Sequence, residues 1–496
     1  MQLSNSTFLV AAALAIVATA TFIVWRARLG NNVAPVEIML PTDVPGRIYP
    51  SLPGALRTIP EWITRDAPFD VVAAFAPVPP ESNAAPLYLD ALYEFRPEEM
   101  AACVAPSERQ ARGPALKERH ARTAYLQGLD QRTVPASERA AVAAQYESAF
   151  EMLRRAQRRP NCVFETSPEI EYIGLPHGRA ARDAMTILVW RTEANLAAGR
   201  IDVAIDDVAL ALRLSRDLRP RSAMMGQLYS VAIDNQALDV CIKAILKGPG
   251  TTIGHCDRIL AVLSQHAEQA IDPMTEGLRY EYPAMLDSLH RQEMHEDVAT
   301  LLGWKGMTLG QVLANTYKIT DDDGERDYEQ LSREIDVEIA AMTPGDYQAE
   351  VAAIKRHFAH LLEHSRDAGP DIDRTIAEAE ALIGNNVARH SVRGFGKCAE
   401  AFRRDRTRLA GTQCLVALFR WNLQNPGQLP PDLSAVCRAA GLGAVPIDGY
   451  SGQPLLWTVI EGQFVIYSVA GDRLDSGGTV DWELGQQSGD WIFRWS

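Results

Sequence analysis

Three histidines in the second half of the chain have a spacing that can hold a metal ion. His357, His360 and His364 stand at positions i, i+3 and i+7, which places all three on one face of a helix. Imidazole nitrogens on one face can bind zinc or a similar ion, and the adjacent Glu363 offers a carboxylate. A single helix leaves the remaining ligand unidentified. The pattern therefore indicates either a transition-metal site or a polar, partly exposed helix face.

Two other groups of polar residues carry weaker signals. His177 follows Pro176 and precedes a helical stretch, where it could line a pocket or simply mark the start of the helix. Acidic residues alternate at positions 321, 323, 325 and 327, as at the start of an EF-hand loop. Gly324 is then at the fourth position instead of the sixth, and Ser332 replaces the glutamate at the twelfth. We therefore expect no EF-hand.

The motifs of common enzyme classes are missing from the sequence. It contains no G-x-S-x-G, no H-E-x-x-H and no dinucleotide-binding glycine pattern. Its seven cysteines include no C-x-x-C pair, which excludes a zinc ribbon and a thioredoxin-type motif. We predict no catalytic or cofactor-binding residues and expect a protein that is not an enzyme.

Composition narrows the class of protein further. The chain has 496 residues, of which 47% are hydrophobic and 23% charged, as in ordinary globular proteins. Its formal net charge of −14 disfavours nucleic acid as a partner, because binding phosphates requires an excess of basic residues. A local basic run at residues 154–159 could form an anion-binding patch, and the alternative is the solvated end of a helix, where cations are favoured.

The N-terminal region predicts a membrane anchor. Residues 8–25 are uncharged and apolar, and as a helix they would span about 27 Å, close to the hydrocarbon thickness of a bilayer. A cleaved signal peptide is the alternative, because residues 18–20 (Ala-Thr-Ala) resemble a cleavage site. Arg26 and Arg28 follow the run and favour a cytoplasmic body by the positive-inside rule. Residues 31–80 are rich in proline and predict an extended linker.

A helical body is predicted over residues 81–415. Its centre, residues 180–247, has three apolar stripes at helical spacing, separated by Gly199 and by Arg219-Pro220. Asp202 and Ser222 are expected to cap the second and third of these helices. Further helices are predicted at residues 83–95, 137–157, 256–270, 275–295, 327–342 and 397–423.

The second central helix resembles a tetratricopeptide-type helix. The matching residues are Gly199, Ala204, Ile205, Ala211, Leu212 and Leu214. Ile233 stands one repeat further on, where the next glycine is expected, so the resemblance implies a single hairpin and not an array.

The end of the chain changes in character. After a long helix, a short helix opens at Pro431-Asp432 and ends at Gly441. Two β-rich runs, residues 455–460 and 463–469, are joined by Glu461-Gly462, which indicates a hairpin. Residues 490–495 can add a strand. These elements predict a small α+β module.

The succession of motifs in this module is specific. It consists of Ala417-Leu418-Phe419-Arg420-Trp421, Asn425-Pro426-Gly427-Gln428-Leu429-Pro430, Pro446-Ile447-Asp448-Gly449-Tyr450-Ser451-Gly452-Gln453-Pro454-Leu455 and Phe464-Val465-Ile466-Tyr467-Ser468-Val469, with Gly471-Asp472 and Asp475 following. Residues 416–496 thus resemble the globular part of type II secretion major pseudopilins, and also the tail of uncharacterised bacterial membrane-anchored helical proteins. The chain lacks a prepilin-peptidase site and an early glutamate in its apolar run, which argues against assembly into a fibre.

The resemblance implies a calcium site in the acidic loop after the second strand. The matching carboxylates are Asp472, Asp475 and Asp481, and carboxylates between flexible glycines suit this cation. Arg473 inside the loop opposes strong binding. A solvated turn without calcium is the alternative. The resemblance also favours a body on the extracytoplasmic side.

Taken together, the sequence predicts a mainly α protein with a transmembrane helix (1–30), a proline-rich linker (31–80), a helical, tetratricopeptide-like body (81–415) and a pseudopilin-like module (416–496). The expected function is a scaffold in the bacterial inner membrane that binds a protein partner of unknown identity. The alternatives are a metal-dependent hydrolase that uses the histidine cluster and an accessory component of a secretion or pilus-like system.

Overall fold

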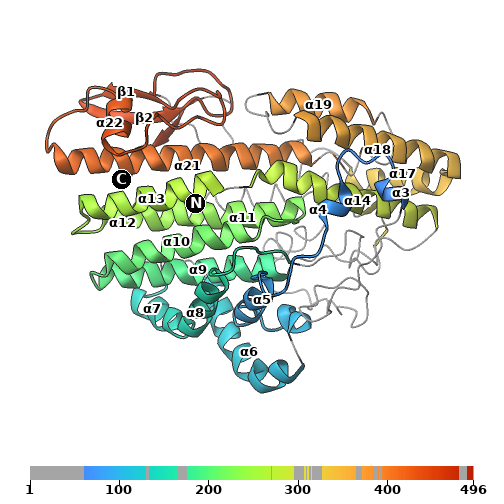
Figure 1. Cartoon of the computed structure of the whole chain (residues 1–496), viewed down its shortest axis with the longest axis horizontal. Coiled ribbons are helices and arrows are strands. Elements are labelled where there is room, and N and C mark those ends of the chain that lie inside the picture. Colours follow the sequence, from blue (N-terminus) through green and yellow to red (C-terminus); the bar gives the residue numbers. More distant parts are fainter. Residues whose placement is uncertain are drawn as a thin grey trace.

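Long helices make up most of the molecule (Figure 1). The computed structural model describes residues 61–494 except 105, 130–132, 165–175, 270, 295–306, 309, 312–313, 315–326, 365–370, 384–388, 390–391, 393 and 480–488. The first half contains α3 (Glu61–Thr64), α4 (Val71–Ala74), α5 (Ala85–Tyr93), η1 (Glu99–Cys103), α6 (Pro106–Gly128), α7 (Ala136–Ala144), α8 (Glu147–Ala156), α9 (Pro176–Ala197), α10 (Ile201–Asp217), α11 (Met224–Gln236), a π-helical turn η2 (Ala237–Ile242) and α12 (Lys243–Lys247). The second half contains α13 (Ile253–Gln269), α14 (Pro273–Glu293), α17 (Tyr328–Ala341), α18 (Pro344–His364), α19 (Ile372–Ala381), α21 (Phe395–Gln424), α22 (Leu433–Ala439), β1 (Leu456–Ile460), β2 (Gln463–Ser468) and β3 (Trp491–Phe493).

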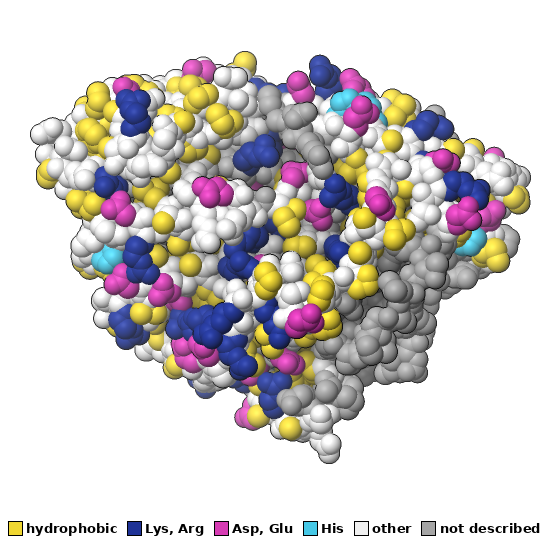
Figure 2. Space-filling model, in the orientation of Figure 1, with side chains coloured by type: hydrophobic (Ala, Val, Ile, Leu, Met, Phe, Trp, Pro, Cys, Tyr) yellow, Lys and Arg dark blue, Asp and Glu magenta, His cyan; other side chains and the backbone are white. Residues whose placement is uncertain are grey.

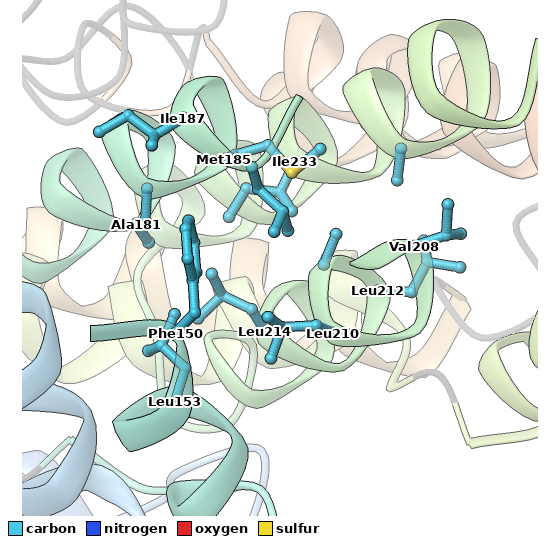
Figure 3. Packing of buried hydrophobic residues seen from close by; sticks show 14 of the residues in the cluster. Phe150, Leu153, Ala181, Met185, Ile187, Val208, Leu210, Leu212, Leu214 and Ile233 are labelled. Carbon is cyan, nitrogen blue, oxygen red and sulfur yellow. The ribbon is translucent and has the colours of Figure 1, made fainter. Parts of the chain in front are cut away.

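The central helices form as the apolar stripes predict. Gly199 lies just beyond the end of α9 with φ +71°, the left-handed conformation that ends many helices. The predicted caps are wrong, because Arg200 and Ala223 precede α10 and α11 and neither makes a side-chain capping bond. Figure 3 shows the apolar side chains of α8, α9, α10 and α11 packed together, among them Phe150, Met185 and Ile233.

Two features of the helical body differ from the prediction. The single helix predicted at residues 137–157 is two helices, α7 and α8, which meet at Gln145 and Tyr146. The ring of Tyr146 is buried there and stacks on Phe95 at 4.9 Å between centroids. In addition, α6 and α19 were not predicted, since α6 is rich in charged residues and α19 is a short helix with few apolar residues, Ile372, Ile376 and Ala379 among them.

The C-terminal strands form an antiparallel sheet in the order β1-β2-β3. Glu461 (φ 51°) and Gly462 (φ 77°) form the predicted two-residue turn between β1 and β2. The sheet and α22 lie on the outer side of α21 (Figure 1). Gly411 of α21 faces Phe493 of β3 so closely that a Cβ at this position would overlap the ring.

α21 is the helix that joins the separate parts of the core. Its first turns pack with α11, α14, α18 and α19. Its later turns contribute Leu415 and Val416 to the core of the central helices, and Cys414 and Leu418 to the core beneath the sheet. The predicted boundary between residues 415 and 416 falls inside this helix, so body and module share it.

Part of the predicted linker is folded onto the body. Residues 61–76, which include α3 and α4, lie against α14 and α18. The hydroxyl of Tyr282 donates to the carbonyl oxygen of Ile63 at 3.2 Å, and the ring of Trp62 lies against that of His290, with 4.8 Å between centroids and a tilt of 38°. Lys355 of α18 donates to the carbonyl oxygen of Trp62 at 3.3 Å. We call residues 61–76 the N-terminal strap.

The membrane assignment has to be corrected. Among the residues that the structure describes, no helix combines the length and the apolar character needed to cross a bilayer. α21 is long enough, but arginines and acidic residues occur along it, as at Arg404, Asp405 and Arg408. The fold class therefore keeps its helical body and small sheet but loses the transmembrane helix. The membrane partner, the signal anchor and the single-pass inner-membrane location are withdrawn with it. The apolar run at residues 8–25 lies outside the described residues.

Candidate binding site at the turn between α10 and α11

A cavity of about 220 Å³ opens where α4, the turn after α10 and the first turns of α14 meet. Its lining consists of Ala74, Phe75, Pro220, Arg221, Glu276, Arg279 and Tyr280. The rings of Phe75 and Tyr280 lie 6.2 Å apart between centroids and form an aromatic wall. The N-terminal strap thus contributes one side of the cavity, and the helical body contributes the other.

The charges in this cavity favour an anion. Arg221 and Arg279 bring two guanidinium groups, whereas Glu276 brings the one carboxylate of the lining. Glu276 accepts a hydrogen bond from Arg279 Nη1 at 3.0 Å and one from the backbone N–H of Arg221 at 3.4 Å. The lining therefore has a formal charge of +1 in a chain whose net charge is −14.

Arg221 is held in an uncommon backbone conformation. Its φ of 51° lies in the left-handed region, which costs a residue with a Cβ about 1–2 kcal/mol. The turn is fixed by Gln227, a buried residue whose side-chain amide donates to the carbonyl oxygens of Arg219 at 2.7 Å and Ser222 at 3.1 Å. Strained residues that surrounding contacts hold in place are concentrated at binding and catalytic sites. The left-handed backbone therefore supports a functional role for this turn.

A buried ion network lies beneath the same turn. Arg219 is 3% exposed, and its Nη2 donates to Asp234 at 2.6 Å and to Asp405 at 3.3 Å. His266 Nε2 lies 3.4 Å from the other oxygen of Asp234. These groups come from the turn after α10 and from α11, α13 and α21, so the network ties four parts of the body together.

The two carboxylates of this network differ in their pKa. Burial and the neighbouring charge of Asp234 raise the pKa of Asp405 to about 7. Burial also acts to raise the pKa of Asp234, but His266 and Arg219 outweigh it and hold the pKa below its ordinary value. The guanidinium of Arg219 thus faces the carboxylate of Asp234, which stays ionised, and that of Asp405, which gains a proton near neutral pH.

The network continues toward the C-terminal sheet. Arg408, one turn after Asp405, donates to Asn235 and lies 2.6 Å from a carboxylate oxygen of Asp239. Its guanidinium also lies over the ring of Trp491 in β3, 5.0 Å from the centroid. A second set of charged contacts therefore lies next to the first along α11 and α21, and it reaches the sheet of the C-terminal module.

The predicted histidine cluster does not converge on one point. His357 is fully buried, hydrogen-bonds to the carbonyl oxygen of Ala379 through Nδ1 at 2.9 Å, and stacks on Phe395. Burial lowers its pKa to about 4. His360 and His364 lie together on the outer side of α18, with 4.4 Å between ring centroids, and His360 Nε2 is 3.4 Å from Glu378. The transition-metal site stays a prediction.

The acidic loop is held by backbone amides. Asp472 accepts from the N–H groups of Leu474 and Gly489, both at 3.0 Å, and Asp475 accepts from Gly477 at 2.8 Å. Asp481 lies outside the described residues. Over the parts of the chain with an assigned structure, no three His, Cys, Asp or Glu side chains gather as a metal site requires. The calcium site also stays a prediction.

The remaining candidates divide between structural roles and undescribed residues. His177 is 2% exposed and stacks on Phe164 at 4.3 Å, and burial lowers its pKa to about 3. It is therefore a neutral core residue of α9. The acidic run at residues 321–326 lies outside the described residues. Figure 2 shows basic and acidic side chains interspersed over one face of the molecule.

Sequence reasoning missed the residues of the cavity and the network. Arg219-Pro220 predicts only the end of a helix, and Arg279 resembles any surface arginine. One signal was present: Asp234 interrupts the apolar run of α11, in which nearly every residue is buried. A charged residue on a fully buried helix requires a partner, and this points to a buried ion pair. Comparison of the chain with models of protein families, with curated proteins and with solved structures gives no match.

Proposed function

We propose that this protein is a helical scaffold that binds an acidic segment of a protein partner in the cavity beside Arg221 and Arg279. The observation that carries the proposal is the composition of the lining, where two guanidinium groups and two aromatic rings surround one carboxylate. Guanidinium groups bind carboxylates with paired, charge-assisted hydrogen bonds. The rings of Phe75 and Tyr280 can pack against the methylene groups of a glutamate side chain.

The size of the cavity favours a side chain as the occupant. At about 220 Å³ it is smaller than the roughly 300–1,000 Å³ typical of pockets for whole small-molecule ligands. A single acidic side chain, anchored while the rest of the peptide runs over the surface, fits this volume. The proposal is consistent with the lack of catalytic motifs and does not depend on the predicted metal sites.

The test compares labelled peptides by fluorescence anisotropy. A fluorescein-labelled peptide rich in glutamate is expected to bind the full chain, and a lysine-rich peptide of equal length is not. Arg279→Ala should weaken binding about 10- to 100-fold, since a hydrogen bond to a charged group contributes about 1.5–3 kcal/mol. The affinity of Arg279→Lys for the acidic peptide should lie between those of the unmodified protein and Arg279→Ala, because lysine keeps the charge and loses the paired hydrogen bonds.

The matched control is Arg374→Ala. The Arg374 side chain is 70% exposed on α19, away from the cavity, and its acidic neighbours Asp371 and Glu378 resemble the Glu276 partner of Arg279. This variant should bind the acidic peptide like the unmodified protein. Equal binding of acidic and basic peptides, or equal losses in both alanine variants, would refute the proposal. Preference for a phosphopeptide over the glutamate peptide would refute the choice of ligand.

A further inference from the structure

Two cysteines of the C-terminal region lie next to each other in the core. The sulfur atoms of Cys414 on α21 and Cys437 on α22 are 4.0 Å apart. Both side chains have no exposed surface and belong to the apolar core beneath the sheet. In the sequence they are 23 residues apart, too far for the C-x-x-C spacing that identifies dithiol motifs.

The geometry requires only a small movement to join them. A disulfide has an S–S distance of about 2.05 Å, so sulfurs that lie 4.0 Å apart must approach by about 2 Å. The other five cysteines lie on other elements or elsewhere on α21. They are Cys103, Cys162, Cys241, Cys256 and Cys398.

We propose that Cys414 and Cys437 form a disulfide bond under oxidising conditions and that this bond fixes α22 on α21. The effect of the bond on the structure follows from where the two cysteines lie. α22 has seven residues, and the segment from residue 425 to residue 432 links it to the end of α21. A disulfide would close this segment into a covalent loop and would hold one edge of the C-terminal module on the long helix.

The chemistry runs as a thiol–disulfide exchange with a small disulfide, for which oxidised glutathione serves as the probe. The Cys437 thiolate attacks one sulfur of oxidised glutathione, forming a mixed disulfide and releasing one glutathione thiolate. The Cys414 thiolate then attacks the Cys437 sulfur and releases the second glutathione. Two protons leave the protein, the two cysteines are oxidised, and one glutathione disulfide is reduced to two thiols.

The surroundings of the pair favour Cys437 as the first nucleophile. A hydrogen bond from the Cys414 thiol lowers the pKa of Cys437, and the nearby positive charge of Arg438 acts in the same direction. The same hydrogen bond, together with burial, raises the pKa of Cys414. Because both sulfurs are buried, glutathione can reach Cys437 only when the packing around α22 opens transiently, so the reaction should be slower in the folded protein than in the unfolded chain.

The experiment counts free thiols in the full chain. The folded protein is incubated with oxidised glutathione, quenched in acid, denatured and alkylated, and its mass is measured. Five alkylated cysteines and a peptide that links residues 414 and 437 are expected, with all seven alkylated after reduction. The melting temperature should rise by about 5 °C on oxidation, since closing a loop of this length stabilises the folded chain.

Variants test the assignment. Cys437→Ser should abolish both the linked peptide and the rise in melting temperature, whereas Cys398→Ser, which removes a buried thiol on the same helix as Cys414, should preserve both. If Cys437→Ser does not fold, Cys437→Ala provides the same test in an apolar site. Seven free thiols after oxidation, a different pairing, or glutathione adducts without the internal link would overturn the proposal. A linked peptide without any rise in melting temperature would overturn the role assigned to the bond.

Discussion

Glu281 is a buried carboxylate that should make the stability of this protein depend on pH. It lies on α14 next to the aromatic wall of the cavity and is 8% exposed. Its one described hydrogen bond comes from the backbone N–H of Met224, at 2.9 Å. Burial raises the pKa of Glu281 from 4.5 to about 7, against the opposing effect of that hydrogen bond.

The size and sign of the effect follow from proton binding. The native state holds the Glu281 proton up to a higher pH than the unfolded chain does. The resulting stability is therefore fully present below about pH 4.5 and is lost as the pH rises through about 7. The interval between the two pKa values corresponds to about 3 kcal/mol of unfolding free energy. Glu281→Gln keeps an oxygen acceptor for Met224 and removes the titration.

The assay is urea unfolding of both proteins at several pH values from 4 to 8. The difference in unfolding free energy between Glu281→Gln and the unmodified protein should shift in favour of the variant by about 3 kcal/mol over this range. Using the difference removes the contribution of all other titrating groups. Glu334→Gln, at an exposed position of α17, is the control and should show no such shift. A pH-independent difference for Glu281→Gln would refute the reasoning.

Three further predictions concern the turn, the network and the module. Arg219→Leu leaves the carboxylates of Asp234 and Asp405 without their shared cation, so urea unfolding at pH 8 should show a loss of about 3–5 kcal/mol; a loss below 1 kcal/mol would contradict the assigned network. Arg221→Gly removes a cavity guanidinium at a position whose left-handed backbone glycine adopts readily, so binding of the acidic peptide should weaken at least 10-fold in fluorescence anisotropy, and unchanged binding would contradict the site. Gly411→Ala forces a methyl group against the ring of Phe493 and should cost about 1–3 kcal/mol in thermal unfolding, whereas Gly396→Ala, with open space around it on the same helix, should not destabilise the protein.

The elements of this fold were predictable wherever a local signal exists. Apolar residues at helical spacing located α10, α13 and α14 to within a few residues, as well as the end of α9 and the start of α11. The predicted third central helix runs to residue 247 only as the succession of α11, η2 and α12. Glu461-Gly462 located the hairpin, because its two left-handed residues suit a two-residue turn. The break between α7 and α8 was not predictable in this way. It depends on Tyr146 stacking on Phe95, a residue 51 positions earlier in the chain.

The candidate site depends almost entirely on such long-range contacts. Arg219 and Asp405 are 186 residues apart in sequence, and Phe75 meets Tyr280 across a similar distance. Each of these residues has an ordinary local explanation, as a helix end or an apolar position, so periodicity gives no reason to group them. For the histidines, in contrast, the local pattern suggests a group that the structure does not bring together. Its spacing is regular, but the structure places His357 inside the core and His364 on the exposed face of the same helix.

The buried charges of α11 and α21 determine which faces of the helices meet. Their contribution to the stability of the body is smaller. Desolvation makes a buried ion pair weak as a source of stability, and apolar residues of similar volume would pack at least as well. An apolar contact between two helices, however, tolerates sliding by a turn. Here Arg219 must meet Asp234 and Asp405 together, and Arg408 must meet Asp239 while it covers Trp491. A shift of α21 by one turn would leave these charges buried without partners. The same alignment places the turn that carries Arg221 beside the cavity. It also places the sheet against Gly411. The network therefore couples the geometry of the candidate site to the seating of the C-terminal module.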